Sequence, residues 1–169
     1  ALSDEGAWTC LPLARDVLPE SVGAAIADQL ALLPEPLRRM LDTAAVLGDR
    51  FRFEVLAAAL ADESLDADEL VDAAVARDLL VEQEPGSDGA DLRFRSPTAQ
   101  KVLYDKLGAR RRKKLHQSVV AALLACDPPE RIAKLLAWHY RMIGEWPAAL
   151  RMAMLAARES LARHDSDGA

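Results

Sequence analysis

Hydrophobic residues recur every three or four positions along most of the chain, and this spacing predicts helices. Four helical segments precede residue 81. Pro36 stands at the start of the second segment and Gly48 closes it, while Asp66 with Glu69 forms a capping pair at the start of the fourth. The four predicted segments cover residues 19–33, 34–48, 54–61 and 66–80.

The hydrophobic pattern changes from helical to alternating after these segments. Residues 79–84 (LLVEQE) and 91–95 (DLRFR) flank the turn-rich sequence PGSDGA, so the pair predicts a β-hairpin. The side chains expected to face the core are Val81, Leu92 and Phe94. The stretch DRFRF, between the second and third helices, is interpreted as a short link. Three helices followed by a hairpin is the order of a winged helix.

A second set of helices is predicted after the hairpin. Ser96 is a favoured N-cap and Pro97 a favoured first residue, so they start a helix that Gly108 ends. The next helix, residues 109–126, opens with five consecutive basic residues. Its buried stripe is predicted to contain Leu115, Val119, Ala122 and Leu123. Two further helices are predicted at residues 130–143 and 146–163.

The last two helices have the spacing of a tetratricopeptide-type hairpin, in which small residues lie where two helices approach closely. The residues at the offsets of that repeat are Leu136, Ala137, Tyr140, Gly144, Trp146, Ala149 and Ala156. The chain departs from the repeat at Ala153, where a large aromatic residue is usual, and a generic helical hairpin is the alternative. A single repeat leaves one face open, so we expect more repeats beyond Ala169.

Composition and charge narrow the class of protein. Hydrophobic residues make up 51% of the chain and aromatic residues 5%, which favours close-packed helices. A net charge of -6 argues against a dedicated nucleic-acid binder, which needs basic surface. Cys10 and Cys126 lack metal-ligand spacing, so we expect free thiols and a cytoplasmic location. No apolar run approaches the ~20 residues that span a bilayer, so no membrane partner is expected.

The sequence contains none of the common catalytic motifs, so we expect no enzymatic activity in this chain. The patterns GxxxxGK[ST], HExxH, CxxC and GxSxG are all absent. His116, His139 and His164 lie on separate segments. We expect His139 to be a packing residue and not a metal ligand, and no metal site or cofactor is predicted within the chain.

A winged helix suggests DNA binding as an alternative function. The helix before the hairpin usually reads the major groove, yet residues 67–79 carry four carboxylates and a single arginine, and phosphates repel carboxylates. The predicted wing loop adds Asp88. The best argument for DNA binding is the basic run, which consists of Arg110, Arg111, Arg112, Lys113 and Lys114. These consecutive side chains wrap around the helix start, so we favour a solvated face or a docking patch for an acidic neighbour.

The order of these motifs resembles the region after the nucleotide-binding core of STAND-class ATPases, as in the AAA-like modules of bacterial adenylate cyclases, protein kinases and LuxR-type or maltose-regulator-like regulators. The resemblance covers residues 18–163, and its most specific parts are LPESV, AAVLGDRF and the series RFR…VLY…L…RRRKKLH. It implies an upstream ATPase domain that binds ATP or ADP, a winged helix that packs on that domain as a regulatory lid, and helical repeats that sense a ligand or partner.

The chain departs from this family at the end of the hairpin. Relatives commonly have a histidine there that approaches the phosphates of the bound nucleotide, whereas this chain has Ser96. The resemblance therefore implies a nucleotide-proximal position for Ser96. The residue type itself favours a helix cap.

We therefore expect a mainly α chain, with a winged-helix domain that carries one β-hairpin and a tetratricopeptide-like helical bundle after it. The expected parts are residues 1–18, a linker or the end of a preceding ATPase domain; 19–108, the winged-helix domain; 109–165, the helical domain; and 166–169, a disordered tail. The expected function is a non-catalytic regulatory fragment of a signalling ATPase, which couples a nucleotide switch to a protein- or ligand-binding surface. A DNA-binding regulator and a free-standing interaction adaptor are the alternatives. The expected interaction residues are the basic run, Tyr140 and Trp146.

Overall fold

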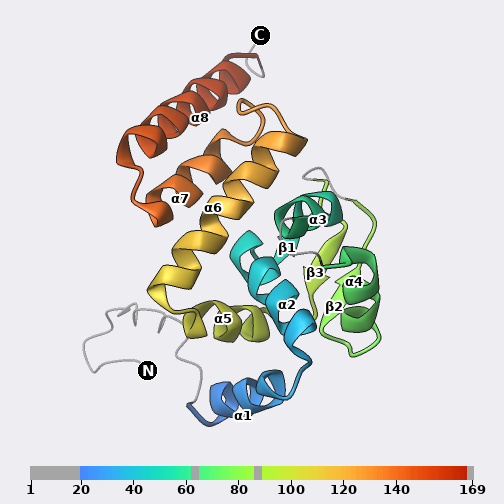
Figure 1. Cartoon of the computed structure of the whole chain (residues 1–169). Coiled ribbons are helices and arrows are strands. Elements are labelled where there is room, and N and C mark those ends of the chain that lie inside the picture. The colour runs from blue at the N-terminus through green and yellow to red at the C-terminus, as the bar shows by residue number, and fades with distance from the viewer. Residues whose placement is uncertain (1–19, 62–64, 86–88, 167–169) are drawn as a thin grey trace, which may run out of the picture.

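The structure is a computed structural model that describes residues 20–61, 65–85 and 89–166 (Figure 1). In these ranges the chain is mainly helical, with eight helices and a small antiparallel sheet of three strands. The elements in chain order are α1 (Glu20–Ala31), α2 (Glu35–Leu47), β1 (Arg50–Phe51), α3 (Phe53–Leu60), α4 (Ala67–Val75), β2 (Leu80–Glu82), β3 (Leu92–Phe94), α5 (Pro97–Lys106), α6 (Ala109–Cys126), α7 (Ala133–Ile143) and α8 (Trp146–Ser166).

Residues at the helix ends explain most of these bounds. Gly48 ends α2, and its N–H donates to the carbonyl of Ala44 at 3.1 Å. The Asp66 carboxylate accepts the N–H of Glu69 at 3.1 Å and so caps α4, as predicted. This helix ends at Val75, earlier than expected, because Asp78 adopts a left-handed conformation with φ 57° that turns the chain into β2.

The sheet confirms the predicted hairpin and adds a strand to it. Its order is β1-β3-β2, so β3 pairs with both neighbours. The interpretation of DRFRF as a link was therefore wrong for Arg50 and Phe51, which form β1. Two residues are too few for an alternating pattern to be recognised. The expectation that Val81 faces the core was also wrong, because Val81 pairs with Arg93. The core-facing residue of β2 is Leu80, which pairs with Phe94, and Leu80 and Phe94 are both buried.

One hydrophobic cluster runs through most of the described chain, from Leu30 in α1 to Ile143 in α7. Helices α2 and α3 and the sheet contribute its centre, and α5 joins it beside α1 and α2. A side-chain hydrogen bond ties α5 to α2, where Gln100 donates to the carbonyl of Ala45 at 2.7 Å. The predicted stripe of α6 is confirmed, since all four of its residues are buried.

Helices α6, α7 and α8 lie side by side in chain order, with α8 outermost (Figure 1). One side of α6 packs on α2 and α3, and another packs on α7. Gly144 joins α7 to α8 in a left-handed conformation with φ 90°, which a residue without a side chain adopts at no steric cost. α8 runs to Ser166, the first residue of the predicted tail, and the rest of that tail lies outside the described residues.

Two sequence expectations concern residues that the structure describes only in part. Cys126 is a free, partly buried thiol, as expected, whereas Cys10 and the predicted linker at residues 1–18 lie outside the described ranges. Asp88 of the predicted wing loop also lies outside them. Among the described helices, none is both long and apolar enough to cross a membrane.

Candidate functional site

Ser96 is the N-cap of α5. Its hydroxyl oxygen accepts the N–H of Ala99 at 3.4 Å, and Pro97 follows as the first helical residue. The cap interpretation is therefore confirmed. Ser96 is half-buried, so its hydroxyl retains some access to solvent. A contact between Ser96 and a nucleotide remains a prediction.

The basic run at the start of α6 divides into structural and solvent-facing residues. Arg111 forms an ion pair with Asp42 of α2, with nitrogen and oxygen 3.0 Å apart. Burial raises the pKa of Asp42, and the neighbouring Arg111 only partly offsets that effect. The side chains of Arg110, Lys113 and Lys114 are exposed. Four of the five basic residues are therefore exposed, and Arg111 differs from the other three because it is ion-paired.

Arg112 holds the junction between α5 and α6. Its Nη2 donates to the backbone carbonyls of Tyr104 and Leu107, each at 3.1 Å, and the Tyr104 carbonyl also accepts the N–H of Leu107 at the end of α5. Its guanidinium carbon also lies 4.6 Å from the centre of the Tyr104 ring, in a cation–π contact. Arg112 is thus part of the scaffold, and its side chain is less available to a partner than those of its neighbours.

A buried histidine pair lies at the junction of α5, α6 and α7. His116 of α6 and His139 of α7 are both 0% exposed, and their Nδ1 atoms are 2.8 Å apart. The Nε2 atom of His116 lies 3.1 Å from the hydroxyl of Tyr104, and that hydroxyl donates to the sulfur of Met142 at 3.6 Å. The Trp138 ring packs edge-on against both imidazoles, with ring centres 5.0 Å and 4.7 Å away.

These contacts define a direction for the hydrogen bonds. The Nε2 atom of His139 is buried without a hydrogen-bond partner among the described residues. If that atom carried the proton, a donor would be orphaned, which is rarer in proteins than an orphaned acceptor. We therefore assign the proton of His139 to Nδ1, which donates to His116. His116 then donates from Nε2 to Tyr104, and Tyr104 donates to Met142.

The environment keeps both histidines neutral. Burial, together with a smaller effect of the positive charge of Arg112, lowers the pKa of His116 to about 4. Burial also lowers the pKa of His139 to about 3, with a smaller contribution from His116. No carboxylate contributes to either shift, so a proton that enters the pair has no counter-charge there. The expectation that His139 packs inside the fold is confirmed by its burial.

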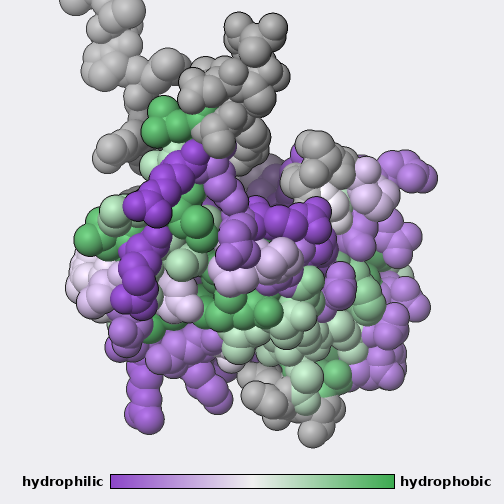
Figure 2. All heavy atoms as spheres, turned by 90° about the horizontal axis from the view of Figure 1, so that it is seen from above, coloured by the Kyte–Doolittle hydropathy of each residue, from purple (hydrophilic) through white to green (hydrophobic). Residues whose placement is uncertain are grey.

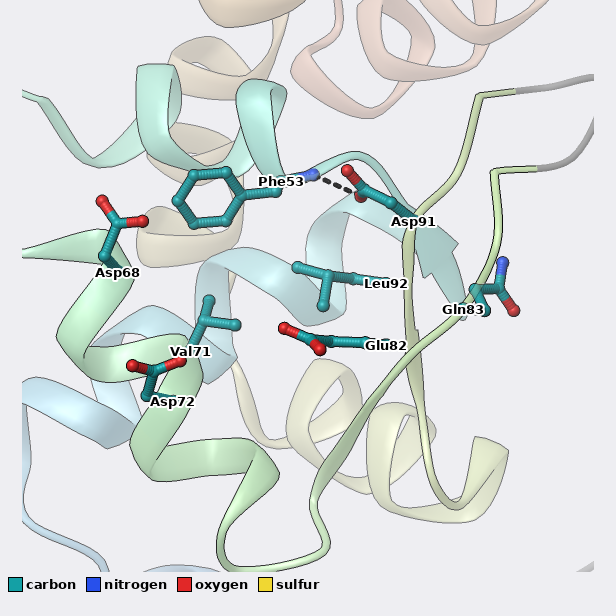
Figure 3. Close-up of a pocket in the computed structure, with 8 residues that line it drawn as sticks. All are labelled: Phe53, Asp68, Val71, Asp72, Glu82, Gln83, Asp91 and Leu92. Atoms are coloured by element: carbon teal, nitrogen blue, oxygen red, sulfur yellow. Dashed lines mark hydrogen bonds between the residues drawn. The ribbon is translucent and has the colours of Figure 1, made fainter.

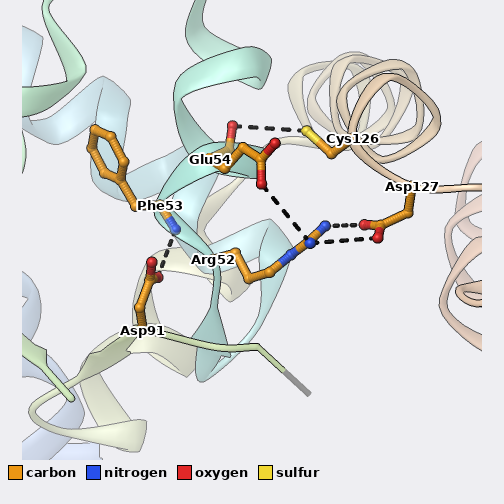
Figure 4. A network of polar contacts seen from close by, with 6 residues as sticks. All are labelled: Arg52, Phe53, Glu54, Asp91, Cys126 and Asp127. Atoms are coloured by element: carbon orange, nitrogen blue, oxygen red, sulfur yellow. Dashed lines mark hydrogen bonds and ion pairs between the residues drawn. The ribbon is translucent and has the colours of Figure 1, made fainter. Parts of the chain in front are cut away.

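An ion pair joins the start of α3 to the end of α6 (Figure 4). Both guanidinium nitrogens of Arg52 approach the carboxylate of Asp127, the residue that ends α6, and the Nη1–Oδ1 distance is 3.4 Å. The side chain of Asp127 is 8% exposed and that of Arg52 is 24% exposed, so solvent screens this pair only partly. We call this pair the Arg52–Asp127 clamp.

Two neighbours position the clamp. Asp91, just before β3, accepts the N–H of Phe53 at 2.7 Å and so satisfies the first donor of α3. Gly89, with φ 70°, lies against Arg52, because a Cβ built there would be 3.2 Å from Cδ of Arg52. The loop before β3 therefore contacts both the start of α3 and the stem of the arginine.

A hollow of about 350 Å³ lies between α4 and the sheet (Figure 3). Phe53, Val71 and Leu92 form its apolar part. Its four carboxylates belong to Asp68, Asp72, Glu82 and Asp91. Negative charge at this position favours basic groups and repels phosphates. No group of three or more potential metal ligands is found in the described part of the chain.

The outer surface of α8 is unusually apolar for an exposed helix face. Trp146 begins the helix and is 65% exposed. Hydrophobic side chains also reach the surface between hydrophilic ones in the view from above (Figure 2). Tyr140, on α7, is half-buried and packs against the core cluster. Trp146 is therefore accessible to a partner, whereas Tyr140 serves packing as well.

The structure does not gather the predicted residues into a single site. Ser96 caps α5, the basic run starts α6, and Trp146 starts α8. Sequence reasoning missed the contact between His116 and His139, because the pairing of two helix faces is not encoded in spacing. Comparison with known protein families, with curated proteins and with solved structures finds no match for this chain.

Proposed function

We propose that the chain is a non-catalytic regulatory module of a STAND-class signalling ATPase. In this role it couples a nucleotide switch in an upstream domain to a helical surface that binds a protein or ligand. The element order from α2 to β3 and the sheet order β1-β3-β2 support a winged-helix arrangement in the first part. The antiparallel pair α7–α8, with buried Ala149 at its interface, supports a tetratricopeptide-like second part.

The observation that carries the proposal is the position of α6. This helix of 18 residues packs on the sheet-bearing half with one side and on α7 with another. Arg111 fixes its start to α2, and the Arg52–Asp127 clamp fixes its end to α3. Exposed basic side chains at its start offer a contact for an acidic upstream domain. A displacement of α6 is therefore passed to α7, because packed interiors transmit strain.

The alternative functions are less well supported. In a DNA-binding winged helix, α4 would enter the major groove, yet its exposed residues include Asp68, Glu69 and Asp72, and the acidic hollow adjoins it. A free-standing adaptor would use the same α8 surface without any transmission through α6. The adaptor and the regulatory module differ in whether the two halves respond together.

Hydrogen exchange of the clamp variant Asp127→Asn tests transmission through α6. We expect faster exchange in α3 and also in α7, because both helices depend on the position of α6. Glu54→Gln is the matched control, since Glu54 is exposed and only 4.0 Å from the same arginine. Faster exchange in α3 with α7 unchanged would favour the adaptor instead.

The proposed nucleotide switch can be tested by reading the coding sequence that surrounds this segment. The proposal expects a phosphate-binding loop in the same polypeptide, upstream of residue 1. In that polypeptide, reversing the charge of Arg110, Lys113 and Lys114 to Glu is expected to change the rate of nucleotide hydrolysis. A frame without a phosphate loop contradicts the switch and leaves only the adaptor.

A further inference from the structure

The exposed apolar residues of the described chain are concentrated on one helix. Seven large hydrophobic side chains are exposed, and four of them belong to α8. These four, with their exposed fractions, are Trp146 at 65%, Leu150 at 63%, Met154 at 51% and Leu161 at 68%. Isolated exposed hydrophobic residues are ordinary, whereas a contiguous group marks a binding surface.

The four residues form one stripe along α8. At about 100° of rotation per residue, their positions fall within an arc of about 80°. The exposed small residue Ala157 lies in the same arc and Ala153 lies about 20° outside it, so both leave room for a close approach. The side that contains buried Ala149 and half-buried Met152 is centred about 130° away from the stripe. We call the outward set the α8 stripe.

Positive charge borders the α8 stripe. Arg151 and Arg158 are exposed, and their spacing of seven residues places them along one edge of it. Residues 130–161 contain five basic and three acidic residues, although the whole chain carries a net charge of -6. This part of the chain is therefore slightly basic in an otherwise acidic protein, and the charges that border the stripe along this edge are those of Arg151 and Arg158.

We propose that the α8 stripe is the docking site for an amphipathic helix of a partner protein, and not the contact for a further repeat of the same polypeptide. The apolar face of this partner helix is bordered by Asp or Glu residues. α8 contains 21 residues, which is about 30 Å of helix, long enough for several turns of a partner to pack along it. Carboxylates beside the partner's apolar face meet Arg151 and Arg158 and fix its direction and register.

Charge also argues against a second copy of this chain as the occupant. In a symmetric pair of α8 helices that runs antiparallel, Trp146 of one copy lies opposite Leu161 of the other. In that register Arg151 of each copy lies beside Arg158 of the other, so like charges meet along the edge. An acidic partner helix removes this repulsion and adds attraction in its place.

The inference rests on the proposed function for the role of α8 as the partner-binding surface, but it can fail separately. Peptide binding to the whole chain reports on the α8 stripe alone. The hydrogen-exchange test of the clamp reports on transmission through α6. If the chain binds the peptide but exchange in α7 is unchanged, the docking site is supported and the switch is contradicted. If exchange in α7 changes but no peptide binds, the switch is supported and the docking site is contradicted.

The experiment uses two labelled helical peptides of about 20 residues with the same Leu and Ala stripe. One peptide has Glu along the border of its stripe and the other has Lys. Fluorescence anisotropy with the whole chain is expected to show micromolar binding of the Glu peptide and about tenfold weaker binding of the Lys peptide. Equal affinities, or no binding of either peptide, would overturn the proposal.

Variants locate the binding site on α8. Leu150→Asp is expected to weaken binding of the Glu peptide about tenfold, and the double variant Arg151→Glu with Arg158→Glu is expected to reverse the preference between peptides. Leu32→Asp is the matched control, because Leu32 is 86% exposed but follows α1, and it should leave binding unchanged. Light scattering tests whether a second copy of the chain occupies the stripe. A dimer that Leu150→Asp dissociates would identify a second copy as the occupant and contradict the proposal.

Discussion

The two parts of the chain, before and after residue 108, place charge and polarity in opposite ways. Residues 1–108 contain 21 acidic and 10 basic residues, whereas residues 109–169 contain 6 acidic and 11 basic ones. Among the described residues, Thr43 is the buried polar side chain of the first part, and its hydroxyl donates within its own helix to Arg39. The second part buries His116, His139 and Asp127, each of which contacts another helix or loop.

This difference separates a scaffold from an adjustable region. The interior of the first part is almost entirely apolar, so most of its packing does not depend on protonation. The half-buried carboxyl of Asp42, whose pKa burial raises, is an exception. The second part holds neutral imidazoles inside and an apolar stripe outside. Both features respond to conditions, the first to protons and the second to a partner. The chain thus combines a fixed half with a half whose surroundings influence its stability.

The largest expected effect tests whether the two parts unfold together. Leu56 in α3 and Leu136 in α7 are both fully buried in the shared cluster. Leu56→Ala and Leu136→Ala are each expected to lower the free energy of unfolding by about 2–5 kcal/mol, with a single transition in urea. Leu124→Ala, at a 42% exposed position of α6, is the control and should change it by less than about 0.5 kcal/mol.

A second unfolding transition that appears in Leu136→Ala alone would contradict the expectation that the two parts unfold together. It would mean that α7 and α8 unfold independently of the sheet-bearing part, and the continuous cluster would not then make the protein cooperative.

Acid is expected to destabilise the second part through its buried histidines. Both imidazoles have folded-state pKa values, about 4 and about 3, below the unfolded value of 6.5. The unfolded chain therefore binds more protons below pH 6.5, and stability falls as the pH is lowered from 6.5 toward 4. Each ring is expected to lower the free energy of unfolding by about 1.4 kcal/mol per pH unit, which amounts to about 2 kcal/mol at pH 5.

Urea unfolding between pH 7.5 and pH 5 measures this dependence. His139→Gln is expected to remove about half of the slope, because one titrating ring remains. Leu56→Ala serves as a control for lost stability, since it should shift the curve without changing its slope. An unchanged slope in His139→Gln would show that other groups cause the pH dependence.

The smallest expected effect concerns Ser96, the N-cap of α5 in the first part. Ser96→Ala is expected to cost about 1 kcal/mol, because the N–H of Ala99 loses its cap, whereas Ser96→Asp should retain the cap. In the ATPase polypeptide that the proposed function requires, Ser96→Asp is expected to weaken ATP binding if residue 96 lies beside the phosphates, since it adds a like charge. Equal ATP affinity in Ser96→Asp and the unchanged protein would limit Ser96 to the capping role.

The sequence predicted the elements of this fold much better than their contacts. Helix caps at Asp66 and Ser96 and the stripe of α6 were recognisable because each depends on residues within one or two turns. The strand at Arg50–Phe51 was missed, because its pairing is decided by β3, some forty residues away. The inward side of β2 was also misjudged, since register and not composition selects Leu80 over Val81.

The candidate sites were less predictable for a related reason. The basic run could be recognised in the sequence, but which of its arginines contact other residues could not, because those contacts depend on Asp42 and on the end of α5. The clamp joins residues 75 positions apart, and the histidine pair joins residues 23 positions apart. Such contacts depend on how the helices are arranged, which local periodicity does not specify. The α8 stripe was hidden for the same reason, as exposure follows from what covers a helix.

The contact between Gly89 and Arg52 has a consequence for how this protein can vary in evolution. The connection between two hairpin strands ordinarily tolerates changes of length and sequence with little cost. Here a methyl group at residue 89 would press on the stem of Arg52, whose guanidinium holds the end of α6. We expect substitutions at Gly89 to be accepted mainly together with changes at Arg52 or Asp127, so this position before β3 and the end of a distant helix should change together.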